Sequence, residues 1–133
     1  MLHQEQLDAM QAHAVFCLPD EACGLVAADA RGKLTMVYCL TNLDGSPYRF
    51  TVDPAEHFAA WRHASGRGWE IVGSFHSHPD SAPAPSATDV AGALDPNWVY
   101  FIVGRVSSAQ SEVRAYEIRG GVVEGVELTI VPR

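Results

Sequence analysis

The 133-residue sequence lacks the features that mark several classes of protein. It has no apolar run near the ~18 residues that a membrane helix requires. Its first ten residues, MLHQEQLDAM, have neither the basic start nor the apolar stretch of a secretory signal. Its three cysteines, Cys17, Cys23 and Cys39, cannot all pair and form no C-x-x-C, which argues against a disulfide framework or a thiolate zinc knuckle. We therefore expect a protein of the cytoplasm that does not bind membranes.

Basic residues are also scarce, since nine Lys and Arg stand against sixteen Asp and Glu, a net charge of −7. A surface of that sign repels phosphate backbones, so we expect no nucleic-acid partner. The chain does contain the balance of a globular domain, with 47% apolar and 19% charged residues. It shows no repeat, low-complexity tract or linker. The prediction is a single domain over residues 1–133.

Apolar periodicity and turn residues predict the elements of this domain. Leu7, Met10, Ala14 and Cys17 recur at helical spacing, and Asp53-Pro54 is a typical helix start. In chain order we expect a helix over 4–17, strands over 23–28, 33–41 and 48–52, a helix from 54 to about 66, a strand over 69–75, a short helix over 86–94, a strand over 98–103, and a hairpin of strands 113–119 and 122–131. This order predicts an α/β or α+β fold with one mixed sheet flanked by helices.

The segment GSFHSHPDSAPAPSATD, residues 73–89, is the part of the sequence that indicates chemistry. His76 and His78 are two apart at the end of an apolar strand, so both point to the same face and can tilt onto one cation. Asp89 can add a carboxylate after the proline-rich loop. Two histidines and one carboxylate form a known catalytic zinc set, which leaves a fourth position for water.

Each part of this segment has a second interpretation. A His-x-His pair is more often two packed or exposed histidines, and Ser86 and Asp89 have the spacing of a helix capping box. Capping and metal binding are compatible, because the positive end of a helix suits a carboxylate. Glu21, in the segment PDEACGLV, has the local character of a solvated loop acid. The residues alone therefore indicate a metal site and identify no general base.

Taken together, Glu21, the His76-x-His78-Pro79 run, six further residues and Ser86-x-x-Asp89 resemble the JAMM motif of the MPN metalloproteases. The resemblance implies a curved mixed sheet flanked by helices, similar to the cytidine deaminase fold. It implies one zinc ion per chain, held by His76, His78 and Asp89. It also implies that Glu21 takes a proton from the attacking water and returns one to the leaving amine, while Ser86 helps to hold the oxyanion.

The short chain is similar to bacterial members that act on ubiquitin-like sulfur carrier proteins. Such enzymes cut after the carrier's C-terminal Gly-Gly, and the segment around Pro19–Gly24 is similar to members that free cysteine. The implied partner is a carrier that ends in Gly-Gly. The alternatives are a non-catalytic MPN scaffold and a zinc hydrolase of another peptide, and a His-His-Asp set also tolerates other metals. The sequence does not fix the oligomeric state.

Three further expectations concern the surroundings of the site. A glycine tail offers no side chains, so an edge strand would help to bind it, and we assign this role to Tyr48–Val52. Trp98 and Tyr100 could line the site, but their residue types favour positions in the core. His57 and His63 are six apart on the second helix, so we expect neither to be a metal ligand.

Overall fold

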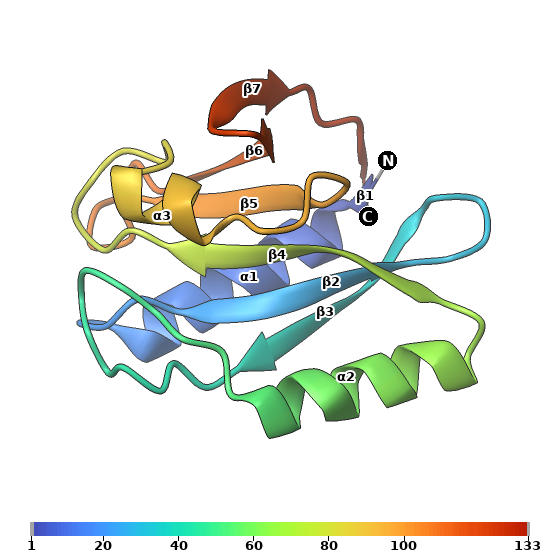
Figure 1. Ribbon diagram of the computed structural model, residues 1–133. Coiled ribbons are helices and arrows are strands. Elements are labelled where there is room, and N and C mark those ends of the chain that lie inside the picture. The colour runs from blue at the N-terminus through green and yellow to red at the C-terminus, as the bar shows by residue number, and fades with distance from the viewer. Residues whose placement is uncertain (1, 133) are drawn as a thin grey trace.

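The structure, a computed structural model, describes residues 2–132 and has three helices among short strands (Figure 1). The elements are β1 (Leu2–His3), α1 (Gln4–Cys17), β2 (Cys23–Ala28), β3 (Leu34–Leu40), α2 (Pro54–Gly66), β4 (Glu70–Ser77), α3 (Ala87–Gly92), β5 (Val99–Gly104), β6 (Glu112–Arg119), β7 (Val122–Val126) and β8 (Ile130–Val131). None of these helices is long and apolar enough to cross a membrane.

Six strands form one mixed sheet in the order β3-β2-β4-β5-β6-β7. β4 and β5 are parallel, and every other neighbouring pair in this sheet is antiparallel. A parallel pair needs a crossover, and α3 lies in the connection between β4 and β5. The expected single mixed sheet flanked by helices is confirmed. β4 lies in the middle of the sheet, so the histidines at its end are fixed by strands on both sides.

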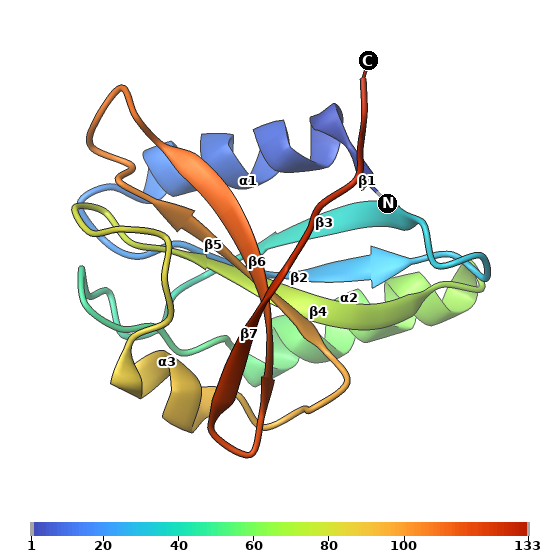
Figure 2. The same cartoon turned by 90° about the horizontal axis from the view of Figure 1, so that it is seen from above.

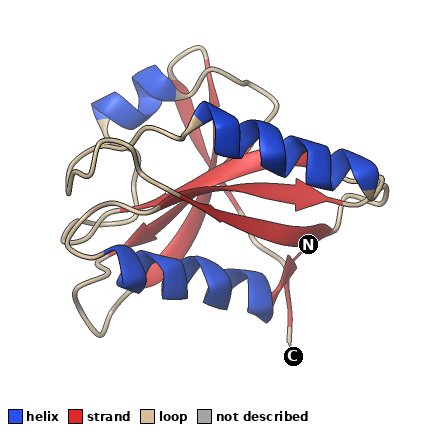
Figure 3. Ribbon diagram, turned by 90° about the horizontal axis from the view of Figure 1, so that it is seen from below, coloured by secondary structure: helices blue, strands red, loops and turns tan. Residues whose placement is uncertain are grey.

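The helices cover both faces of this sheet. α1 lies on one face, while α2 and α3 lie on the other (Figures 2 and 3). α1 buries Leu7, Met10 and Ala14 against a core that includes Phe75 and Phe101. A smaller core that includes Cys23, Leu25, Leu40 and Ala60 lies on the α2 side. Side chains alternate along β4, so consecutive residues of this strand face different helices.

The two helix boundaries that matter for the site follow from local chemistry. Asp53 accepts a hydrogen bond from the backbone N–H of Ala55 at 2.9 Å, and Pro54 occupies the first turn, as expected. Ser86 caps α3 in the same manner. α3 therefore starts beside the carboxyl end of β4, and α2 starts near the end of β3 (Figure 1).

The expected strand over Tyr48–Val52 is wrong. The segment contributes only an isolated bridge between Asn42 and Val52, and the Tyr48 side chain is 85% exposed. The Asn42 amide explains this difference, because it donates to the Arg49 carbonyl at 3.0 Å and accepts from the Thr51 N–H at 3.2 Å. A side chain thus satisfies backbone groups that a neighbouring strand would otherwise bind.

The C-terminal hairpin forms as expected up to Val126. Gly120 and Gly121 make the turn between β6 and β7 with φ of 56° and 81°, angles that favour glycine. The expected second strand over 122–131 is too long, because β7 ends at Val126. Ile130 and Val131 leave the sheet and pair with β1 in a separate two-stranded parallel sheet.

Candidate metal centre

The two histidines lie at the carboxyl end of β4 and on its α2 side. The alternation of the strand puts Ser74 and His76 on this face, and Phe75 and Ser77 on the α1 side. His78 follows the strand with the same parity. The two imidazoles are 4% and 6% exposed as residues, so both rings are removed from bulk water.

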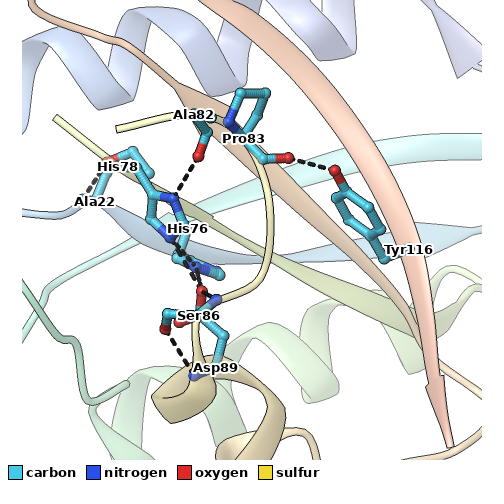
Figure 4. Close-up of polar contacts among 9 residues, drawn as sticks. Ala22, His76, His78, Ala82, Pro83, Ser86, Asp89 and Tyr116 are labelled. Carbon is cyan, nitrogen blue, oxygen red and sulfur yellow. Dashed lines mark hydrogen bonds and ion pairs between the residues drawn. The ribbon is translucent and has the colours of Figure 1, made fainter. Parts of the chain in front are cut away.

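The proline-rich loop after His78 is fastened to β5 and β6. The His78 N–H donates to the Val103 carbonyl at 2.8 Å, and the Tyr116 hydroxyl donates to the Pro83 carbonyl (Figure 4). Gly104 allows this contact, since a Cβ there would lie 2.3 Å from the nitrogen of Pro83. These anchors return the chain toward β4, so that α3 starts opposite the histidines.

Asp89 is held at the start of α3 by a complete capping box. Its backbone N–H donates to Ser86 Oγ at 3.1 Å, and its Oδ2 accepts from the Ser86 N–H at 2.9 Å. The same Oδ2 faces both histidines. One arrangement of Ser86 and Asp89 therefore serves both purposes: it caps α3, and it directs the Asp89 carboxylate toward the histidines.

Three atoms converge on one point. Asp89 Oδ2 lies 3.0 Å from His76 Nε2 and 3.0 Å from His78 Nε2, and the two nitrogens are 3.2 Å apart (Figure 4). Ligands about 2.0–2.1 Å from a tetrahedral zinc ion lie about 3.3 Å from one another. The spacing and the donor types fit such an ion. These three residues are the one group in residues 2–132 with the composition and closeness of a metal site.

Charge and hydrogen bonding prepare these groups as ligands. Burial raises the pKa of Asp89, but hydrogen bonds from His76 and His78 outweigh this effect and hold the pKa well below its usual range. Burial lowers the pKa of His78, but its bonds to Asp89 and to the Ala82 carbonyl outweigh that effect and raise the pKa above its usual value. Asp89 is thus an anion at any pH near neutral. A cation at this point would compete with protons for the same ligand atoms.

The two imidazole rings are oriented by different means. His78 Nδ1 lies 2.8 Å from the Ala82 carbonyl, so this nitrogen carries a hydrogen, and Nε2 presents a lone pair to the shared point once it has released its own proton. The His76 ring stacks on Phe50, with centroids 4.7 Å apart and planes at 22°. Phe50 belongs to the segment before α2, so a distant part of the chain fixes the second ligand.

Glu21 reaches the site from the segment between α1 and β2. The residue is 4% exposed, and its Oε1 is buried without a hydrogen-bond partner in the described chain. Burial raises the pKa of this carboxyl to about 7, His78 lowers it and Asp89 raises it further. An unpaired buried carboxylate destabilises the fold unless something binds it. A polar partner such as a water at the metal position would satisfy it.

The backbone around Glu21 is tied to β4 and to the segment before α2. The Ala22 N–H donates to Ser77 Oγ at 2.7 Å, and the Ser77 N–H donates to the Ala22 carbonyl at 3.1 Å. Asn42 Nδ2 donates to the Glu21 carbonyl at 3.0 Å. Ser77 lies between the two histidines in the sequence and is fully buried on the opposite face of β4, so its bond to Ala22 links the Glu21 segment to the strand that bears both histidines.

These residues have the arrangement of a known domain. A model of the prokaryotic homologues of the JAB domain matches residues 3–119, which include Glu21 and the whole metal centre. The chain belongs to the prokaryotic JAB family. The resemblance to the JAMM motif of MPN proteins, which share the JAB domain, is thereby confirmed.

Relatives of this JAB domain have names that specify activities. The CysO-cysteine peptidase of Mycobacterium tuberculosis is 30% identical over 132 residues, which cover 98% of this chain and 90% of that protein. The desampylase of Haloferax volcanii is 36% identical over 86 residues, 63% of this chain and 62% of that one. A solution structure from Desulfitobacterium hafniense has a TM-score of 0.87 and 36% identity, and the match covers 99% of this chain and 91% of that one.

The JAB domain also uses residues that the sequence did not reveal. Ser77 was only the unspecified residue of His-x-His, and neither Asn42 nor Phe50 belongs to the recognised motif. Trp98 packs on the smaller core, as expected. Trp98 and Tyr100 also line a cavity beside the metal centre, which agrees with the alternative that the two residues line the site. Their residue types alone did not decide between the two placements.

The two helix histidines lie outside the group of metal-binding atoms. His57 lines the same cavity, with its ring 6.2 Å from that of Trp98. His63 lies elsewhere on α2, where its Nδ1 is 2.7 Å from the Tyr38 hydroxyl and its Nε2 accepts from Arg67. His63 is therefore a useful control for experiments on the ligands.

Proposed function

We propose that this JAB domain is a zinc-dependent peptidase or isopeptidase. Its substrate is the bond after the C-terminal Gly-Gly of a ubiquitin-like or sulfur carrier protein. The observation that carries the proposal is the convergence of His76, His78 and Asp89, together with the buried Glu21 carboxylate, whose Oε1 has no hydrogen-bond partner within residues 2–132. A scaffold protein has no need for that carboxylate, which destabilises the fold.

In this proposal His76, His78 and Asp89 hold one zinc ion per chain. When bound, zinc supplies a Lewis acid that polarises a carbonyl and lowers the pKa of water from ~15.7 towards ~7. The histidines contribute neutral Nε2 atoms, and Asp89 contributes the one negative charge among the ligands. Three protein ligands leave a tetrahedral position open for chemistry.

Glu21 is the general base and then the general acid. Its raised pKa, about 7, means that it exchanges protons readily near neutral pH. The carboxylate takes a proton from the attacking water and then passes it to the leaving amine. Asn42 donates to the Glu21 carbonyl and the adjacent Ala22 N–H donates to Ser77 Oγ, and these two bonds hold the Glu21 segment beside the histidines.

Ser86 contributes to the oxyanion site. Its Oγ already accepts the Asp89 N–H, so the hydroxyl hydrogen is free to donate to an oxygen near the metal centre. Ser86 is exposed, so a substrate carbonyl can approach it. Substitution by Ala removes both functions, since the cap of α3 is lost as well.

Two features support a carrier protein as substrate. The relative whose match covers 98% of this chain is named a CysO-cysteine peptidase. The relative whose match covers 63% of this chain is named a desampylase. The net charge of −7 disfavours nucleic acid. We further propose that residues 1–133 act as one domain and that the reaction takes place in the cytoplasm.

The test is cleavage of defined carrier adducts. A purified ubiquitin-like carrier ending in Gly-Gly is joined either to cysteine or to a lysine side chain, and product is measured by mass spectrometry. We expect the wild-type protein to cleave at least one adduct and Glu21→Gln to cleave neither. Full activity of Glu21→Gln would remove Glu21 as the base. Cleavage of unrelated peptides only would remove the carrier as the substrate.

A further inference from the structure

The backbone carbonyl of Ala82 sets how His78 is presented to the metal position, because His78 Nδ1 bonds it at 2.8 Å. A metal-binding histidine is oriented by the hydrogen bond of its other ring nitrogen, and loss of that partner costs about 10- to 100-fold in metal affinity. A backbone carbonyl has no side chain of its own to direct it. The orientation of His78 therefore depends on what holds the loop that bears Ala82.

The loop between β4 and α3 is fixed by different means in its two halves. Four backbone hydrogen bonds join residues 78–81 to residues 103–107, at the end of β5 and just after it. Residues 82–85 cannot continue this pattern, because Pro83 and Pro85 have no N–H group and the Ala84 N–H bonds the Ala82 carbonyl within the loop. The half that bears the acceptor of His78 must therefore be held through its carbonyl groups and its packing.

Tyr116 supplies a hydrogen bond from the sheet to this second half. Its hydroxyl donates to the Pro83 carbonyl, one peptide unit after the Ala82 carbonyl (Figure 4). On β6 Tyr116 has the parity of Ile118, which lines the cavity on the side of α2 and α3, so its ring points toward the face on which α3 lies. The residue is half-buried, so water competes less for this hydrogen bond than it would at an exposed site.

Gly104 lets Pro83 lie directly on β5. A Cβ at this position would be 2.3 Å from the Pro83 nitrogen and 2.7 Å from its Cα, and both are backbone atoms. Turning a side chain cannot relieve such contacts, so a methyl group at Gly104 has to displace the loop. Pro83 is thus fixed on two sides, by the surface of β5 and by the Tyr116 hydroxyl.

A displacement of Pro83 is passed on to His78 through a rigid unit. The Ala82 carbonyl belongs to the planar peptide group that ends at the Pro83 nitrogen, so the two move together. Hydrogen bonds weaken steeply as their angle departs from linearity. A loop that is free to move at Pro83 would therefore loosen the bond between the Ala82 carbonyl and His78 Nδ1.

We propose that Tyr116 is a positioning residue of the metal centre. Its hydroxyl fixes Pro83, Pro83 fixes the Ala82 carbonyl, and this carbonyl fixes the ring of His78. Tyr116 acts on zinc affinity through the loop and is not itself a ligand. This inference rests on the proposed function, because it concerns the same zinc site.

Tyr116→Phe tests the inference, since it keeps the ring and removes only the hydroxyl. The dissociation constant for zinc is measured by competition with a chromophoric chelator. We expect zinc to bind roughly threefold to tenfold more weakly, the effect of one lost hydrogen bond. An unchanged zinc affinity would overturn the inference.

Tyr100→Phe is the matched control. Tyr100 lies opposite Tyr116 on the neighbouring strand β5, and its hydroxyl donates to the Asp95 carbonyl at 2.9 Å, in a loop that bears no metal ligand. The control should keep the zinc affinity of wild type. Equal weakening in both variants would reflect a general loosening of the fold and would also overturn the inference.

A second measurement follows the His78 ring in the zinc-free protein. The hydrogen on Nδ1 is observed by ¹H–¹⁵N NMR and assigned by its loss in His78→Ala. We expect it to exchange with water several times faster in Tyr116→Phe than in wild type, and at the wild-type rate in Tyr100→Phe. Equal exchange rates in wild type and Tyr116→Phe would contradict a role for Tyr116 in holding the ring.

Gly104→Ala displaces the same loop from the side of the strand. We expect it to weaken zinc binding at least tenfold, because the acceptor of His78 moves with Pro83. Gly125→Ala on β7, where an added Cβ meets nothing within 4 Å, is its control and should bind zinc like wild type. Unchanged zinc affinity in Gly104→Ala would overturn the claim that this loop orients the ligand. Tyr116→Phe decides the matter if Gly104→Ala does not fold.

The inference and the proposed function fail in different ways. Zinc binding that is equal in wild type and Tyr116→Phe would overturn the inference and leave the proposed function in place. A wild-type protein that binds no zinc would overturn the proposed function. The exchange of the His78 ring hydrogen in the zinc-free proteins would then still support or overturn the part assigned to Tyr116.

Discussion

The two sides of the metal centre are held by different kinds of contact. On the His78 side, hydrogen bonds hold almost every group, from Ala82 and Asp89 on His78 to Ser77 on the backbone next to Glu21. On the His76 side, the Phe50 ring stacks on the imidazole and an apolar cavity follows. The first side has the directional contacts that proton transfer requires. The second has non-directional contacts, which suit the recognition of a side chain.

This division separates two kinds of effect. Variants on the polar side should change metal binding or kcat, because they move the groups that act on the reacting atoms. Variants on the apolar side should change KM and substrate preference with metal retained.

The largest effect is expected for Glu21→Gln. Loss of the base should lower kcat by about 10²- to 10⁴-fold, the usual contribution of general acid–base catalysis, while zinc content stays unchanged. Rates on a carrier adduct and metal analysis are the two measurements. Glu70→Gln, an exposed change on β4, is the control and should keep full activity. A proportional loss of zinc in Glu21→Gln would mean that Glu21 belongs with the ligands.

Ser77→Ala should have the next largest effect. The change removes the acceptor of the buried Ala22 N–H, so the Glu21 segment shifts relative to the histidines. We expect a loss in kcat on the order of tenfold to a hundredfold, with little change in KM. The exposed change Ser107→Ala serves as the control. A rise in KM with an unchanged kcat would show that Ser77 does not act through the base.

Glu21→Gln should also stabilise the protein after zinc has been removed with a chelator. The folded-state pKa of Glu21, about 7, lies above its ordinary value of 4.5. The ionised form therefore disfavours folding, and wild-type stability falls as pH rises from about 4.5 through 7. Denaturant unfolding at pH 8 should give the variant about 1–3 kcal/mol more stability than wild type, with the gain vanishing near pH 4. A less stable variant at pH 8 would contradict the raised pKa.

The smallest effect is expected on the apolar side. Val52→Ala removes two methyl groups from the cavity wall, so KM for a carrier adduct should rise about threefold to tenfold. Zinc content and kcat should stay at wild-type values. Val122→Ala, where the side chain is 61% exposed on β7, should change neither constant. A fall in kcat with an unchanged KM would contradict the assignment of Val52 to substrate binding alone.

The sequence predicted the polar side far better than the apolar one. Strand alternation alone places His76 and His78 on one face, and the S-x-x-D spacing places Asp89 at a helix start. Both are local patterns, and the structure brings these residues together as expected. Glu21 has no local pattern, because its approach to the histidines depends on the pairing of β2 with β4. Only the resemblance to a family indicated its part.

The errors and the undecided placements share a physical cause. Tyr48–Val52 alternates like a strand, but the Asn42 side chain takes up its backbone groups. Trp98 and Tyr100 could be core or site residues by type, and the loop that turns Phe50 toward them has no periodicity. Val122–Val131 divides because Ile130 and Val131 find partners in β1. In each case a contact with a distant segment decides the outcome, and periodicity contains no information about such contacts.

The most direct test of the account is the metal content of the purified protein after zinc is offered and the excess removed. Wild type, His78→Ala and the control His63→Ala are compared by elemental analysis. We expect one zinc per chain in wild type and in His63→Ala, and little in His78→Ala. A wild-type protein without zinc, or a His78→Ala protein with one zinc per chain, would contradict the central claim that His76, His78 and Asp89 form a catalytic metal site.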